Sequence, residues 1–156
     1  MPIVTKRKRR RPPVVDQTVA LRYIESSALV AALLEADAVA RASIRSAGRR
    51  VTSTLTLAEA GRAIVRARAA GRLDAAGERA AVRALGMFGR HCDLVAVTDE
   101  ILVRVARPFP VEPVRTLDAA HLATAEYLGE PPALVTIVTR DERVRGNALA
   151  MGFAVE

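Results

Sequence analysis

The chain has 156 residues, of which 51% are hydrophobic and 26% are charged, as in an ordinary single globular domain. Its one cysteine, Cys92, excludes an intramolecular disulfide and a zinc site made of several cysteines. The net charge of +7 is concentrated in residues 6–11, which contribute +6, while the other 18 basic and 17 acidic residues nearly cancel. The net charge therefore gives no reason to expect that the body of the protein binds nucleic acid.

The amino-terminal segment differs from the rest of the chain. Residues 1–18 contain the run KRKRRRPP, which repels itself and has no apolar periodicity, so we expect a disordered basic extension before a single domain over residues 19–156. The extension could bind nucleic-acid phosphates or an acidic protein, or could serve only as a solubilising tail. No apolar run follows it as in a secretory signal, and no charge-free stretch approaches the ~20 residues of a membrane span, so we expect a cytoplasmic protein.

From residue 19 onward, short apolar segments alternate with segments of helical periodicity. The predicted strands are, in chain order, residues 19–24, 51–55, 92–97, 134–138 and 153–155. The predicted helices are residues 26–34, with Ser26 or Ser27 as the cap, and residues 37–47, 57–70, 74–88, 99–106, 117–128 and 141–151. This order predicts an α/β fold with helices on both faces of a parallel sheet, in which ligands bind outside the carboxyl ends of the strands.

Three carboxylates follow the ends of predicted strands or lie in the first turn of the helices after them: Glu25, Glu59 and Asp141. A fourth, Asp118, opens the helix after a loop that contains Pro108, Pro110 and Pro113. Taken singly, each has a structural explanation. The segments Thr56 to Glu59 and Thr139 to Glu142 match capping boxes, in which an acid satisfies a backbone N–H group, and Asp118 follows a predicted helix cap at Thr116.

Taken together, four converging carboxylates would repel one another in a partly dry cleft unless a divalent cation neutralised them. Oxygen ligands without a histidine or cysteine partner suit Mg²⁺ or Mn²⁺. The chemistry typical of such a site is phosphoryl transfer, with a metal-activated water attacking phosphorus. A receiver-like phosphoacceptor domain is set aside, because the chain has no lysine after Lys8.

Four segments that contain these acids resemble the motifs of a known family. They are Tyr23 to Val30, Thr52 to Glu59, Arg115 to Ala125, and Val138 to Asp141 together with Ala148, Gly152 and Phe153. They are similar to the motifs of PIN-domain ribonucleases, specifically the VapC-type toxins of bacterial toxin–antitoxin pairs. The third segment is the most specific match, and the resemblance runs from about Val19 to Glu156.

The resemblance implies a three-layer α/β/α PIN-like fold with a central parallel sheet, and a Mg²⁺- or Mn²⁺-dependent endoribonuclease. The metal-site roles that it implies fall on Glu25, Glu59, Asp118 and Asp141, with supporting hydroxyl groups at Ser27 and Thr139. The partners that it implies are an RNA substrate, a cognate antitoxin whose peptide occupies the active-site groove, and a second copy of the chain in a homodimer.

Glu25 stands where the family normally has aspartate. The extra methylene displaces the carboxylate by about 1.5 Å, and Mg²⁺ requires nearly ideal octahedral geometry. Glu25 could bind the ion through another rotamer or a water, or could favour Mn²⁺. The alternative is a catalytically weak PIN module that binds RNA or an antitoxin without turnover, since an error of about 1 Å at a reacting group can cost about 10²-fold in rate.

Several side chains near the acids carry two interpretations each. Arg115 and Arg140 could support the site by holding substrate phosphates, or could pair with the acids and lower their pKa values. His121 follows Asp118 by three residues and so shares its helical face, where it could orient Asp118 or simply pack near the sheet. A strip of arginines is either a solvated face or a surface for RNA or a partner; its members are Arg62, Arg66, Arg68 and Arg72.

Overall fold

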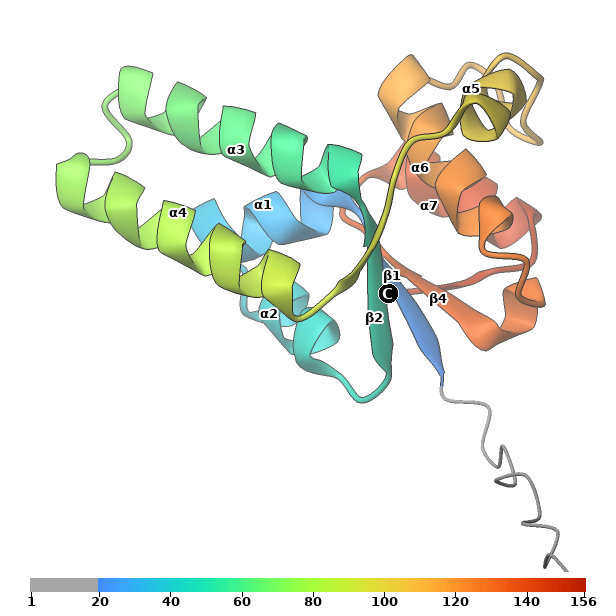
Figure 1. The fold of residues 1–156 in the computed structure, drawn as a ribbon, viewed down its shortest axis with the longest axis horizontal. Coiled ribbons are helices and arrows are strands. Elements are labelled where there is room, and N and C mark those ends of the chain that lie inside the picture. Colours follow the sequence, from blue (N-terminus) through green and yellow to red (C-terminus); the bar gives the residue numbers. More distant parts are fainter. Residues whose placement is uncertain (1–19) are drawn as a thin grey trace, which may run out of the picture.

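A computed structural model describes residues 20–156 (Figure 1), so the extension predicted over residues 1–18 lies outside the described residues. Within these residues, five parallel strands form one sheet in the order β3-β2-β1-β4-β5. The strands are β1 (Leu21–Ile24), β2 (Arg49–Ser53), β3 (Asp93–Val95), β4 (Val135–Val138) and β5 (Ala154–Val155). Parallel neighbours require crossover connections, so helices must cover the faces of this sheet.

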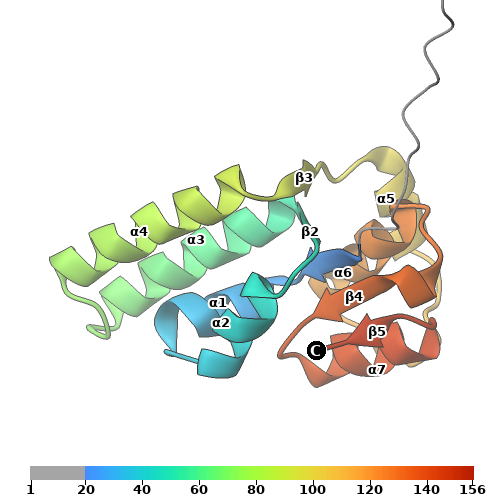
Figure 2. The same ribbon diagram turned by 90° about the horizontal axis from the view of Figure 1, so that it is seen from below.

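Helices do cover both faces, which confirms the predicted α/β/α fold with a central parallel sheet (Figures 1 and 2). They are α1 (Ser26–Leu34), α2 (Ala38–Arg45), α3 (Thr54–Ala69), α4 (Ala75–Arg90), α5 (Asp99–Val105), α6 (Thr116–Tyr127) and α7 (Glu142–Ala150). A short 3₁₀ turn, Pro132–Leu134, precedes β4. Within residues 20–156, no helix combines the length and the apolar character that crossing a membrane requires.

The strands β1 and β4 are largely buried, which explains why they read as mostly apolar runs rather than as alternating sequences. Leu21 and Tyr23 of β1 belong to a core that includes residues of α5, α6 and α7. Ile24, on the opposite face, belongs to a second core with residues of α1, α2 and α3. Most of the helical residues in this second core are alanines, so the helices approach the sheet closely.

The amino-terminal end of the sheet contains a buried charge that the apolar pattern did not predict. Arg22 is only 5% exposed, and its guanidinium lies 2.5 Å from the Glu156 carboxylate and donates to the Ser43 carbonyl at 2.7 Å. The neighbouring turn requires glycine, because Gly48 has φ +136° and a Cβ atom there would lie 2.5 Å from the Ala20 carbonyl oxygen.

Helices α3 and α4 form a hairpin that extends away from the sheet, as Figure 2 shows. Helix α3 carries Glu59 in its sheet-proximal half, and the residues that it buries extend along its length: Thr56, Ala60, Ala63, Ile64 and Ala67. Helix α4 buries only Ala81 fully, so most of its surface is open.

Two strands differ from their predictions. The strand predicted over residues 51–55 is β2 at Arg49–Ser53, because Ser53 caps α3 and the helix begins at Thr54. The apolar segment predicted over residues 92–97 forms only the three-residue β3, and its Asp93 and Leu94 are exposed. The reason is its position, since β3 is an edge strand that pairs with β2 alone. The short edge strand predicted over residues 153–155 is confirmed as β5.

Candidate functional site

Glu25 lies directly after β1 and is itself the N-cap of α1, so the prediction that Ser26 or Ser27 caps this helix is wrong. Its carboxylate is 3% exposed. It accepts hydrogen bonds from the Ser27 backbone N–H at 3.0 Å, the Ser26 hydroxyl at 2.6 Å, the Thr139 hydroxyl at 2.8 Å and the Ser27 hydroxyl. These donors compensate the burial of the charge.

The two hydroxyl groups predicted to support the site connect Glu25 to the loop after β4. Ser27 accepts the backbone N–H of Arg140 at 2.8 Å, and Thr139 accepts that of Asp141 at 3.0 Å. Since both hydroxyls also donate to Glu25, a hydrogen-bond network connects the start of α1 to the start of α7.

Glu59 lies well inside α3, because the helix begins at Thr54 and is capped by Ser53. The segment Thr56 to Glu59 is therefore not a capping box, and Thr56 is buried within the helix. The Glu59 Oε2 atom instead lies 2.6 Å from Nε2 of His121 in α6.

His121 is 1% exposed and links Glu59 to the sheet. Its Nδ1 lies 2.9 Å from the hydroxyl of Tyr23, and its Nε2 is also 3.8 Å from Oε1 of Glu25. A carboxylate only accepts, so Nε2 carries the hydrogen shared with Glu59. Burial raises the pKa of Tyr23, so this phenol keeps its proton and can donate to Nδ1. Of the two interpretations of His121, packing near the sheet is therefore confirmed. Its Nε2 hydrogen bond is to Glu59, so it does not orient Asp118.

Asp118 lies in the first turn of α6, whose N-cap is Arg115 without a side-chain cap bond, so the predicted cap at Thr116 is wrong. Burial raises the pKa of Asp118, and the negative charges of Asp141 and Glu25 raise it further. Its buried Oδ2 atom has no hydrogen-bond partner within residues 20–156. Asp118 is thus a destabilised carboxylate facing other acids.

Asp141 is the N-cap of α7 and uses one oxygen for the helix. Its Oδ1 accepts the backbone N–H groups of Arg143 at 2.8 Å and Val144 at 3.2 Å. The predicted box with Glu142 as the reciprocal partner is therefore wrong, because Asp141 itself caps the helix. Its Oδ2 takes no part in these two bonds.

The other three predicted acids are each linked to Glu25, but through intermediate groups or through charge rather than by direct contact. His121 lies between Glu25 and Glu59, Thr139 joins Glu25 to the Asp141 backbone, and Asp118 responds to the charges of Glu25 and Asp141. Among residues 20–156, however, no three His, Cys, Asp or Glu side chains are already gathered closely enough to hold one ion. The acids share one electrostatic environment without forming a preassembled cage.

The two arginines behave differently. Arg140 pairs with an acid that the sequence analysis did not single out, as its Nε donates to Oδ2 of Asp37 at 2.9 Å. The backbone N–H of Ala40 and then Arg140 lower the pKa of Asp37. Arg115 is exposed, and its side chain makes no hydrogen bond or ion pair with any residue the structure describes. Its positive charge acts to lower the pKa of Asp118, against the larger effect of burial.

Comparison with known proteins identifies the fold family. The family model described as "PIN domain" matches residues 22–148. The chain belongs to the PIN-domain family. Two curated relatives from Mycobacterium tuberculosis are named ribonucleases: VapC46 is 39% identical over 140 residues, covering 85% of this chain and 94% of that protein, and VapC35 is 35% identical over 137 residues, covering 85% and 93%. The VapC-type resemblance of the four motifs is thereby confirmed.

Solved structures share the PIN fold at low sequence identity. VapBC2 from Rickettsia felis, bound to a promoter DNA fragment, matches with a TM-score of 0.59 and 10% identity, covering 87% of this chain and 97% of that one. PAE2754 from Pyrobaculum aerophilum matches with a TM-score of 0.55 and 23% identity over 88% and 83% of the two chains. VapBC-1 from Haemophilus influenzae matches with a TM-score of 0.54 and 11% identity over 87% and 96%.

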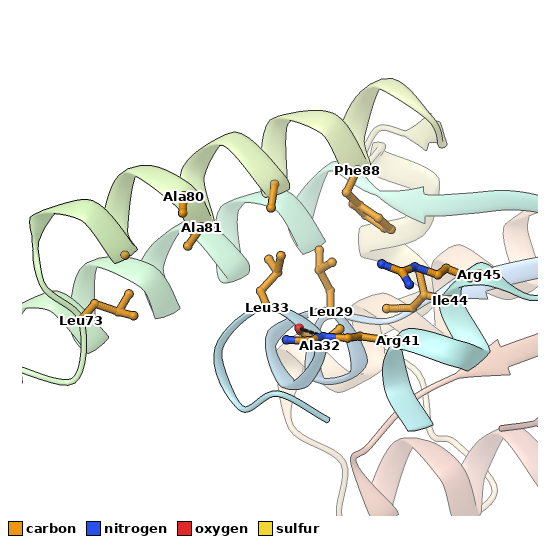
Figure 3. A pocket seen from close by; sticks show the side chains of 12 residues that line it. Leu29, Ala32, Leu33, Arg41, Ile44, Arg45, Leu73, Ala80, Ala81 and Phe88 are labelled. Atoms are coloured by element: carbon orange, nitrogen blue, oxygen red, sulfur yellow. Dashed lines mark hydrogen bonds between the residues drawn. The ribbon is translucent and has the colours of Figure 1, made fainter. Parts of the chain in front are cut away.

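This PIN domain also has an apolar groove between α1, α2 and α4, with a volume of about 490 Å³ (Figure 3). Leu29, Leu33 and Phe88 form its floor and walls, and Arg41 and Arg45 lie at its edge. Arg41 donates to the Ala32 carbonyl at 2.8 Å, whereas Arg45 has no ion-pair partner among the described residues. The groove is a place where an apolar surface with nearby negative charge could dock.

Proposed function

We propose that this PIN domain is a divalent-metal-dependent endoribonuclease and the toxin of a toxin–antitoxin pair. Two relatives that align with most of the chain are named ribonucleases. The observation that carries the proposal is Asp118, whose buried, unpaired Oδ2 atom and raised pKa lie beside the charges of Glu25 and Asp141. A buried carboxylate among other carboxylates is costly unless a cation offsets it.

The donor set fits Mg²⁺ or Mn²⁺, since all four acids offer oxygen and no thiolate lies among them. Asp118 and Asp141 each have an oxygen outside the hydrogen bonds described above, and Glu59 could exchange its bond to His121 for the ion. When bound, such an ion lowers the pKa of a coordinated water and stabilises negative charge at phosphorus.

The chain's own residues orient the carboxylates and could bind the substrate. The hydroxyl groups of Ser27 and Thr139 hold the Glu25 carboxylate in position. The Asp141 side chain is oriented by two backbone N–H groups at the start of α7. Arg115, exposed beside Asp118, is suited to hold a substrate phosphate by paired N–H donors. No general-base histidine is required by this arrangement.

The direct test is incubation of the purified chain, free of antitoxin, with a defined panel of tRNA and rRNA in Mg²⁺, Mn²⁺ or excess chelator. We expect cleavage at discrete positions with either metal and none with chelator. Cleavage that persists in chelator would contradict the metal mechanism. The absence of cleavage in every condition would contradict the enzyme assignment.

One observation favours the second candidate, a catalytically weak PIN module that binds RNA or antitoxin. The Glu25 carboxylate already accepts four hydrogen bonds, so an ion would have to compete with hydroxyl groups for its oxygens. The longer glutamate side chain places the carboxylate where Ser27 and Thr139 can reach it.

The substitution Glu25→Asp separates the two candidates. We expect Mg²⁺-dependent cleavage to rise or stay equal, because the shorter carboxylate withdraws from the hydroxyls. The free energy of unfolding should fall by about 1 kcal/mol for each hydrogen bond lost. Both are measured on one preparation by RNA cleavage and urea denaturation. A loss of cleavage would mean that the extra methylene is required for the site.

We further propose that the cognate antitoxin docks an amphipathic helix in the groove between α1, α2 and α4. An apolar helix face matches Leu29, Leu33 and Phe88, and acidic side chains on its flank would meet Arg41 and Arg45. The predicted homodimer and the cytoplasmic location stay predictions.

Ala80→Glu tests the docking groove. Ala80 lines the groove and is exposed, so the new carboxylate should leave the fold intact but weaken antitoxin binding by about 10²-fold, because docking would bury an unpaired charge. Val82→Glu is the matched control, since Val82 is 54% exposed on the same helix and does not line the groove. Calorimetry with the purified cognate antitoxin measures both. Equal affinities for the two variants would place the antitoxin elsewhere.

A further inference from the structure

A second groove adjoins the candidate site on the side of Glu59. It has a volume of about 330 Å³ and runs between α3 and the start of α6. Its lining residues are Leu55, Ala58, Glu59, Arg62, Arg66 and Leu117. Because Leu117 directly precedes Asp118, one wall continues into the acidic centre and the opposite wall carries Glu59.

The groove contains two arginines without a described partner. Arg62 and Arg66 follow Glu59 by three and seven residues, so all three side chains lie on one face of α3. Both arginines are exposed, and neither side chain forms an ion pair or hydrogen bond with any residue in the range 20–156. Arg68 of the same helix, in contrast, lies 3.4 Å from the Glu78 carboxylate.

The remaining lining is apolar. Leu55 and Ala58 belong to the first turns of α3, and Leu117 is 48% exposed at the start of α6. A surface with an apolar floor and a row of guanidinium groups suits a nucleotide strand, whose bases or riboses contact the apolar atoms while its phosphates meet the arginines.

We propose that this groove is the subsite for the RNA strand that flanks the cleaved phosphodiester. Arg62 and Arg66, one helical turn or about 6 Å apart along α3, bind backbone phosphates, and Leu117 contacts a base or ribose. The inference rests on the proposed ribonuclease function and adds where the strand lies. The arginines also offset the repulsion between a phosphate backbone and the acids. The net charge of the folded body is too small to provide this attraction, so it must come from local groups.

The test measures RNA binding separately from cleavage. Fluorescence anisotropy with a fluorescein-labelled single-stranded RNA of mixed sequence is recorded in excess chelator, over a range of salt concentrations. We expect Arg62→Ala and Arg66→Ala each to weaken binding several-fold and to reduce the slope of log affinity against log salt by about 0.7, the value for one phosphate contact on a single strand. Arg62→Lys and Arg66→Lys should recover most of the slope, because they keep the charge.

Arg83→Ala is the matched control. It removes the same charge from an exposed helical position outside the groove, where no ion pair is described, so its affinity and salt slope should match the wild type. Thermal unfolding should show equal stability for all these variants, since every substituted side chain is exposed.

Three results would overturn the inference. If the chain cleaves RNA and the groove variants bind it like the wild type, the strand lies elsewhere and the ribonuclease proposal stands. If the groove variants lose affinity for the antitoxin but not for RNA, the groove is a protein-binding surface. If the wild type neither cleaves nor binds RNA, the proposed function fails and the subsite fails with it.

Discussion

Asp118→Asn is expected to abolish RNA cleavage and, at the same time, to stabilise the metal-free protein. The activity should fall by at least about 10²-fold, because a bound ion supplies several kcal/mol of transition-state stabilisation and Asp118 is proposed to hold it. The stability should rise because asparagine removes a charge that burial and the neighbouring acids Asp141 and Glu25 disfavour.

The sign of the pH dependence follows from the raised pKa of Asp118. An acid whose pKa is higher in the folded than in the unfolded state does not lower the free energy of unfolding at a pH where both states are protonated. It destabilises the fold as the pH rises through the interval between the two values. Wild type and Asp118→Asn should therefore have equal thermal stability below about pH 4, the ordinary range of aspartate, and should diverge toward neutral pH.

Thermal unfolding in chelator and in Mn²⁺ measures the stability effect independently of cleavage. The metal should raise the melting temperature of the wild type more than that of Asp118→Asn. The ion binds only the folded site, and it should bind that site more weakly when Asp118 is replaced. Asp99→Asn is the matched control, since it makes the same chemical change in the first turn of α5. We expect this control to keep full activity and to gain no stability. A stabilised Asp118→Asn variant that still cleaves RNA would remove Asp118 from the site.

The overall fold was accessible from the sequence because each of its signals is local. Apolar strands bounded by helices indicate a buried parallel sheet, and the positions of β1 and β4 follow from their apolar runs alone. The edge strand β3 was predicted too long, because an apolar segment does not reveal whether it has one neighbour or two. Arg22 was missed because its partner Glu156 lies 134 positions away.

The site was accessible only as a set of residue types at one edge of the sheet. Sequence spacing could not show whether an acid caps a helix or belongs to a cluster of acids. Both predicted capping boxes are wrong, since Ser53 caps α3 and Asp141 caps α7. The contact between His121 and Glu59 joins residues 62 positions apart, so periodicity pointed to the wrong acid. The participation of Tyr23, an apparent core residue of β1, left no signal of its own in the sequence.

His121→Ala should reduce both stability and cleavage. The substitution leaves the buried Tyr23 hydroxyl without its His121 partner, which costs about 1–3 kcal/mol. It also removes the partner of one Glu59 oxygen, which water can replace at a smaller cost because the Glu59 side chain is 24% exposed. Cleavage should fall by about 10- to 100-fold, the usual effect of removing a residue that orients a metal ligand. Urea denaturation and RNA cleavage in saturating Mn²⁺ measure the two effects.

Two further variants separate orientation of Glu59 from support of the core. Tyr23→Phe removes the hydroxyl but keeps the bond between His121 and Glu59, so it should lower stability by about 1 kcal/mol and leave cleavage nearly unchanged. In a double-mutant cycle, Glu59→Gln should cost much less cleavage in the His121→Ala background than alone, because the two residues then act as one unit. Additive losses would mean that His121 supports only the core, and a Tyr23→Phe variant as inactive as His121→Ala would assign the effect to packing.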